Sequence, residues 1–118
     1  MGLEVPEEKW RPFEDRGVLI LRLPIEEGVF TWGSVGRALA EMGIVHVLAE
    51  GGGKTAAWML REGAVSRLEL FLAPRILGAS GVSSVGDLGG ISLKDAPSLS
   101  WRRVRMIGED VQVTADVK

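Results

Sequence analysis

The run at residues 44–55, IVHVLAEGGGKT, constrains the fold of this chain more than any other segment. An apolar run typical of a β-strand, residues 44–49, ends at Glu50, and three glycines separate it from a helix-forming sequence. A joint of this kind presents backbone N–H groups and the positive end of a helix dipole to an anion. In open α/β sheets, ligands bind beyond the carboxyl ends of the strands. The run therefore predicts a phosphate-binding turn beside a carboxylate.

Apolar runs and helical patterns alternate on both sides of this joint. Strands are expected at residues 18–23, 44–49 and 67–73, and helices at 7–15, 31–42 and 54–62. Thr31 is a suitable N-terminal cap, and Gly43 and Gly63 are suitable helix stops. Short joints between strands and helices predict a parallel sheet with right-handed crossovers.

The character of the chain changes after residue 78. Residues 78–90 are rich in glycine and serine and predict an irregular loop. Two further strands are expected near residues 99–107 and 110–117, joined by a tight turn at Gly108-Glu109. The expected fold is therefore α/β, with a mixed sheet that is mostly parallel and carries an antiparallel C-terminal strand pair.

Composition excludes several functional classes. The chain has 118 residues, a net charge of −2, no cysteine and one histidine. This length predicts a single domain, residues 1–118. The missing cysteines exclude disulfides, thiolate metal sites and cysteine nucleophiles, and one histidine excludes a histidine-rich metal site. We expect a cytoplasmic protein that binds neither nucleic acid nor membrane, because its charge is balanced and no signal or spanning segment is present.

The Gly-Lys-Thr sequence at 53–55 is not a nucleoside-triphosphate P-loop, because that motif needs a glycine where Leu48 stands. The glycines either form a tight turn that packs a helix on a sheet or let a ligand approach closely, and the latter is favoured. Glu50 follows an apolar run directly, so we expect it to be half-buried and to contact a ligand. His46 is expected to be a packed or edge residue. The arginines of 102–105 are expected to form a solvated face.

A longer stretch of the sequence resembles a known family. Residues 50–78 combine the motif Glu50-Gly51-Gly52, a helix, a short turn, a strand and Ala73-Pro74-Arg75-Ile-Leu-Gly78. This order is similar to the C-terminal reductase domain of the bifunctional riboflavin-biosynthesis deaminase–reductase. The segments LKDA at 93–96 and IGEDV at 107–111 resemble the tail of that domain. The zinc deaminase half has no counterpart here.

The resemblance implies a dihydrofolate-reductase-like fold and NADPH-dependent reduction of 5-amino-6-(5-phosphoribosylamino)uracil to the ribitylamino product. It implies that Glu50 contacts the substrate. It also implies that the cofactor is bound by the glycine joint, which comprises Gly51, Gly52, Gly53, Lys54 and Thr55. Lys54 adds a charge there that the family pattern usually lacks. No catalytic residue or metal ligand is assigned within this chain.

The resemblance covers only the later part of the reductase domain, which is roughly 200 residues long in this family. We therefore expect a C-terminal portion of that domain, with an open sheet edge that favours a homodimer. Two alternatives remain open. The chain is either a nucleotide-binding or structural fragment without activity alone, or a pteridine or folate reductase of the same fold class.

Overall fold

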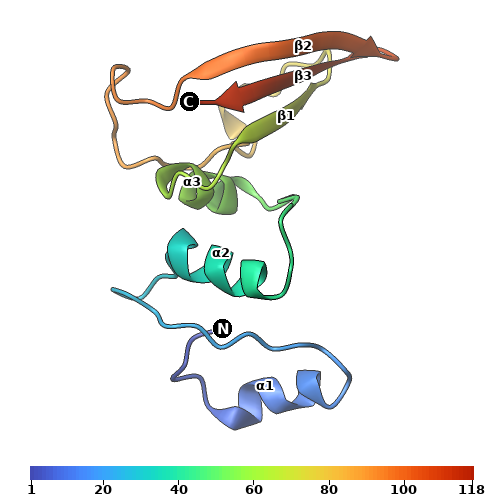
Figure 1. Ribbon diagram of the computed structural model, residues 1–118. Helices are drawn as coiled ribbons and strands as arrows, with labels where there is room; N and C mark the ends of the chain where they lie inside the picture. The colour runs from blue at the N-terminus through green and yellow to red at the C-terminus, as the bar shows by residue number, and fades with distance from the viewer. The chain divides into compact units, whose positions relative to one another are not determined.

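The computed structural model describes the whole chain, Met1–Lys118, as two compact units (Figure 1). The first unit comprises Met1–Leu48 and the second comprises Ala49–Lys118. None of the helices has both the length and the apolar character that crossing a membrane requires.

Two helices form the regular part of the first unit. Helix α1 comprises Glu7–Glu14 and α2 comprises Trp32–Glu41, which confirms both predictions to within a residue or two at each end. The Thr31 hydroxyl accepts a hydrogen bond from the backbone N–H of Ser34 at 3.3 Å and so caps α2. The chain leaves α2 through Gly43, whose φ of +77° is the left-handed conformation of a helix stop.

One helix and a three-stranded sheet form the second unit. Helix α3 comprises Gly53–Arg61, strand β1 comprises Arg67–Leu72, and a short 3₁₀ helix, η1, comprises Gly78–Ser80. Strands β2 and β3 comprise Leu99–Ile107 and Asp110–Val117. Figure 1 shows β3 between β1 and β2, and both pairings are antiparallel. The helix, the three strands and the largely irregular loop were all predicted and are confirmed.

The register of the sheet separates two kinds of side chain, because neighbouring residues of a strand point to opposite faces. Leu68 pairs with Ala115 and Val104 pairs with Val113, so one face is apolar. Glu69 pairs with Thr114, and the face they share is mainly polar. That polar face is defined by Arg67, Glu69, Arg103, Arg105, Gln112, Thr114 and Asp116.

The expected mostly parallel sheet is not present, because two of its predicted strands do not form. Residues 18–23 and 44–49 belong to no strand ladder, and Leu23 alone makes an isolated bridge, to Gly2. A strand requires a neighbour for its backbone N–H and C=O groups. Residues 18–23 have only the short contact with the chain start, and residues 44–49 belong to no ladder, with Val45 and Leu48 each 81% exposed. The observed fold is a small α/β arrangement whose sheet is antiparallel.

The core of the chain is small. Ala57 on α3 and Ala115 on β3 are the apolar residues that are fully buried, with 2% and 0% of their surface exposed. Large side chains on the apolar face of the sheet stay accessible, and Val104 and Met106 are each 63% exposed. Because so few apolar side chains are buried, the stability of the second unit depends strongly on the backbone hydrogen bonds between its strands and on its turns.

Candidate functional site

The glycine joint lies at the start of α3, in the second unit. Gly52 is the residue that precedes the helix, and no side chain caps this end. The carbonyl of Gly52 accepts hydrogen bonds from the N–H groups of Thr55 and Ala56, at 2.9 and 3.1 Å. The helix therefore begins with backbone donors and dipole aimed out of its N-terminus, which is the arrangement that attracts an anion.

The three glycines of the joint have different surroundings. A β-carbon on Gly51 would lie 2.6 Å from the β-carbon of Thr55, and one on Gly53 would lie 2.5 Å from the carbonyl oxygen of Ser83. A β-carbon on Gly52 would meet nothing within 4 Å. Gly51 and Gly53 are therefore required by packing within the protein. Gly52 is the position where space is open to an approaching ligand.

The polar residues around the joint are accessible to solvent. Glu50, Lys54 and Thr55 are exposed, whereas Gly53 is partly covered. The expectation that Glu50 is half-buried is wrong. The apolar run before it forms no strand, so no neighbouring strand covers its carboxylate. His46, expected to be packed or at an edge, is exposed as well.

The loop that follows η1 contacts the first residue of α3. The N–H of Gly86 donates a hydrogen bond to the carbonyl of Gly53 at 2.8 Å. The guanidinium of Arg61 donates to the carbonyl of Asp87 at 2.9 Å. Two adjacent residues of the loop are thus bonded to α3, one to its first residue and one to the side chain of its last. The one sequence signal for this contact is the high glycine content of residues 78–90.

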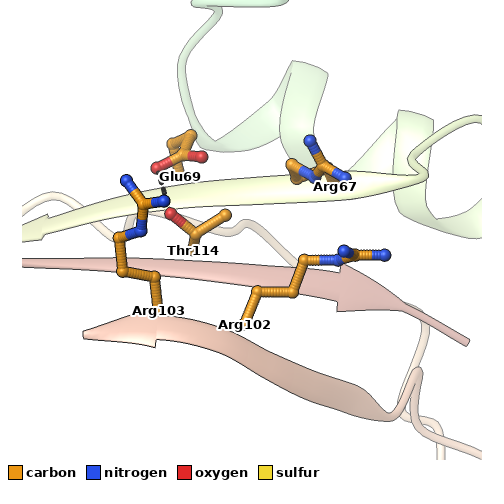
Figure 2. A pocket seen from close by; sticks show the side chains of 5 residues that line it. All are labelled: Arg67, Glu69, Arg102, Arg103 and Thr114. Atoms are coloured by element: carbon orange, nitrogen blue, oxygen red, sulfur yellow. Dashed lines mark hydrogen bonds between the residues drawn. The ribbon is translucent and has the colours of Figure 1, made fainter.

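The polar face of the sheet carries a separate, shallow depression of about 360 Å³ (Figure 2). It is lined by Arg67, Glu69, Arg102, Arg103 and Thr114. Figure 2 shows the Thr114 hydroxyl directed at the Glu69 carboxylate, to which it donates at 2.9 Å. The arginines are exposed, as predicted for residues 102–105. Glu69 is thus paired with Thr114, and Arg67 and Arg102 are both paired with Asp116, so the depression does not resemble a prepared ligand site.

On the polar face, the carboxylate whose pKa is clearly shifted is Asp116. It accepts a hydrogen bond from the Nε of Arg102 on β2 and another, at 3.2 Å, from the Nε of Arg67 on β1. These arginines lower the pKa of Asp116, and the hydrogen bond from Arg102 is the largest cause. The perturbed group stabilises the pairing of three strands, and it lies outside the glycine joint.

Comparison with known proteins decides the family. The sequence profile described as the RibD C-terminal domain matches residues 4–113. The chain belongs to the RibD C-terminal domain family. Among curated relatives, the riboflavin biosynthesis protein RibD of Aquifex aeolicus (strain VF5) is 33% identical over 106 residues. RibD of Bacillus amyloliquefaciens is 33% identical over 78 residues.

The matched region is a small part of these RibD proteins. It comprises 90% of this chain but 28% of the Aquifex protein, and 65% of this chain but 21% of the Bacillus protein. A solved structure, Acinetobacter baumannii RibD, form 2, superposes with a TM-score of 0.76 at 20% identity. It covers 98% of this chain and 33% of the solved chain. This likeness confirms the expected α/β fold class.

Proposed function

We propose that this chain is a C-terminal portion of a riboflavin-pathway reductase domain, residues 1–118, and that it binds NADPH at the glycine joint. The observation that carries the proposal is the opening at Gly52, in a chain of the RibD C-terminal domain family. A phosphate placed there meets the uncapped N-terminus of α3 and no side-chain obstacle. Lys54 adds a positive charge one residue into the helix.

The residues present fit a cofactor phosphate well. Gly52 allows close approach, Gly51 and Gly53 hold the backbone, and Thr55 packs over Gly51. When bound, NADPH supplies a hydride to C1′ of the opened ribose of 5-amino-6-(5-phosphoribosylamino)uracil, and a proton completes the reduction to the ribitylamino product. The proposed role of Glu50 is to accept hydrogen bonds from the substrate.

The decisive experiment separates binding from turnover. NADPH is titrated by fluorescence, and its oxidation is then followed at fixed enzyme concentration with and without the pyrimidine substrate. Saturable binding together with substrate-dependent oxidation supports the proposal. Absence of NADPH binding contradicts it.

A substitution tests the assignment of Glu50. Replacing a carboxylate that accepts substrate hydrogen bonds, as in Glu50→Gln, should lower kcat/KM by about one to two decades. Glu109→Gln, an exposed carboxylate in the β2–β3 turn, is the matched control and should leave kcat/KM unchanged. Unchanged kcat/KM in Glu50→Gln removes this residue from the site.

The second candidate is a nucleotide-binding fragment that is inactive alone. Two observations favour it as the alternative: Glu50 is exposed, and residues 18–23 and 44–49 lack strand partners. NADPH binding without turnover is its expected signature. Substrate preference for a pteridine or folate would instead indicate another reductase of this fold class.

The same proposal includes the formation of the mostly parallel sheet that the sequence predicts. We infer that residues 44–49 become a strand when another strand pairs with them, because their exposed valines and leucine would then be covered. A homodimer is one proposed source of such pairing. Light scattering that shows only monomer at micromolar concentration contradicts the dimer. Slowed hydrogen exchange at Val45 and Val47 in the associated state would support it.

A further inference from the structure

The first residue of α3 and the loop at residues 83–87 touch through their backbones. Besides the hydrogen bond from Gly86 to Gly53, a β-carbon on Gly86 would lie 3.0 Å from the carbonyl oxygen of Gly53 and 3.2 Å from its carbonyl carbon. A β-carbon on Gly53 would overlap the carbonyl oxygen of Ser83, at 2.5 Å. Position 53 therefore requires glycine, and a β-carbon at position 86 would push the carbonyl of Gly53 away by a few tenths of an ångström.

The same loop also accepts a hydrogen bond from the side chain of the last residue of α3. Arg61, the last residue of the helix, donates to the carbonyl of Asp87, next to Gly86 in the chain. The carboxylate of Asp87 in turn accepts a hydrogen bond from the N–H of Gly89 at 2.8 Å, which fixes the turn that follows. Two hydrogen bonds thus tie residues 83–87 to α3, one to the backbone of its first residue and one from the long side chain of its last.

The contact matters because α3 has no side-chain cap. In a capped helix, the cap residue fixes the direction of the first N–H groups. Here Gly86 binds the carbonyl of Gly53, so the loop holds the first turn of α3 without using its N–H donors. Because anion binding depends on donor direction, a shift of a few tenths of an ångström at Gly53 should weaken binding, by less than the hundredfold that a displacement of about 1 Å can cause.

We propose that residues 83–87 position the N-terminus of α3 for the cofactor phosphates, and that Gly86 is a positioning residue of the cofactor site. This inference rests on the proposed function, because it assigns a role to Gly86 in the binding of NADPH. The loop acts through its backbone contact with Gly53.

The test compares two glycines of the glycine-rich stretch at residues 78–90, Gly86 and Gly81. In Gly86→Ala, the added methyl group displaces the carbonyl of Gly53. In Gly81→Ala, the new β-carbon would have its nearest contacts at 3.4 Å, to Leu77 and to the carbonyl of Gly78. The dissociation constant for NADPH should rise roughly threefold to tenfold in Gly86→Ala and less than about twofold in Gly81→Ala. The midpoints of thermal unfolding of the two variants should agree.

Two further readouts separate positioning from a general loss of structure. The backbone amide signals of Gly53 and Lys54 should shift in Gly86→Ala without any ligand, while those of β2 and β3 stay in place. Binding of 2′-phospho-ADP-ribose, which lacks the nicotinamide, should weaken by the same factor as binding of NADPH. A loss confined to NADPH contradicts a role at the phosphates.

The possible failures are distinguishable. A wild-type chain that binds neither ligand overturns the proposed function. A wild-type chain that binds, with Gly86→Ala binding equally well, overturns the positioning role alone. If Gly86→Ala does not fold, Arg61→Met serves instead, because it removes the other anchor of the loop without entering the joint. An unchanged dissociation constant in Arg61→Met would then overturn the positioning role.

Discussion

The carboxylate of Asp116, on the central strand β3, accepts a hydrogen bond from the Nε of Arg102 on β2. The opposite oxygen of the carboxylate accepts from Arg67 on β1, so a single side chain connects all three strands of the sheet. These bonds favour the ionised carboxylate and lower the pKa of Asp116 from its ordinary value of 3.8.

The lowered pKa of Asp116 predicts a pH-dependent contribution to stability. A carboxyl group whose pKa is lower in the folded state stabilises the protein above its unfolded pKa. This stabilisation is lost as the pH falls through the folded pKa. Asp116→Asn should therefore lower the urea midpoint of unfolding at about pH 7 and have little effect near pH 2. An equal effect at both pH values would contradict the ionic origin.

The matched control for Asp116→Asn is Glu109→Gln, which removes a carboxylate from the turn between β2 and β3. Its urea midpoint should stay close to that of the wild type at neutral pH. Raising the salt concentration should reduce the difference between Asp116→Asn and the wild type, because both arginines are more than half exposed.

The turn between β2 and β3 predicts a second, conformational effect. Gly108 has a φ of +60°, and a β-carbon costs about 1–2 kcal/mol in this region. Gly108→Ala should lower the free energy of unfolding by that amount. Gly108→Asn should cost less, because asparagine tolerates left-handed backbone. Gly33→Ala, within α2 and without a positive φ, should be neutral or stabilising in the same urea titration. Equal losses at Gly108 and Gly33 would contradict the argument.

Local signals explain which parts of the fold were predictable. Strands at 99–107 and 110–117 were predicted with their observed bounds, because the Gly108 turn and the apolar pattern are contained in the segment itself. The helix stops at Gly43 and Gly63 were predictable for the same reason. The strand predicted at 44–49 does not form, and its absence could not be predicted from its own residues, because strand formation depends on a neighbour that the segment does not contain.

The sequence predicted where the backbone of the candidate site lies, but it did not predict which residues contact that backbone. The glycine joint and the start of α3 lie within a residue of their predicted positions. Gly51 is crowded by Thr55, four residues later, whereas the crowding at Gly53 arises from tertiary contacts with Ser83 and Gly86, some thirty residues later in the chain. Glu50 is exposed because its covering strand is absent, which no property of Glu50 itself indicates.

The buried alanine of the central strand predicts the effect of added volume. Ala115 has no exposed surface and lies between Leu68 on β1 and Trp101 on β2. Ala115→Leu should lower the free energy of unfolding by about 1–3 kcal/mol, because the extra carbons force neighbouring side chains out of place. Ala79→Leu, at an exposed position of η1, is the control and should be nearly neutral in urea titrations. A neutral Ala115→Leu would show that the sheet can open to accept the side chain.

Lys54 provides the last prediction, which concerns charge at the glycine joint. A cation at the N-terminus of a helix opposes the helix dipole, so its removal should leave the thermal midpoint unchanged or slightly raised. If Lys54 faces a cofactor phosphate, Lys54→Gln should weaken NADPH binding about two- to fivefold at low salt. The variant should also show a smaller salt dependence of the dissociation constant. Lys94→Gln, an exposed lysine in the segment before β2, should match the wild type. Equal affinities of Lys54→Gln and Lys94→Gln at every salt concentration would separate Lys54 from the cofactor site.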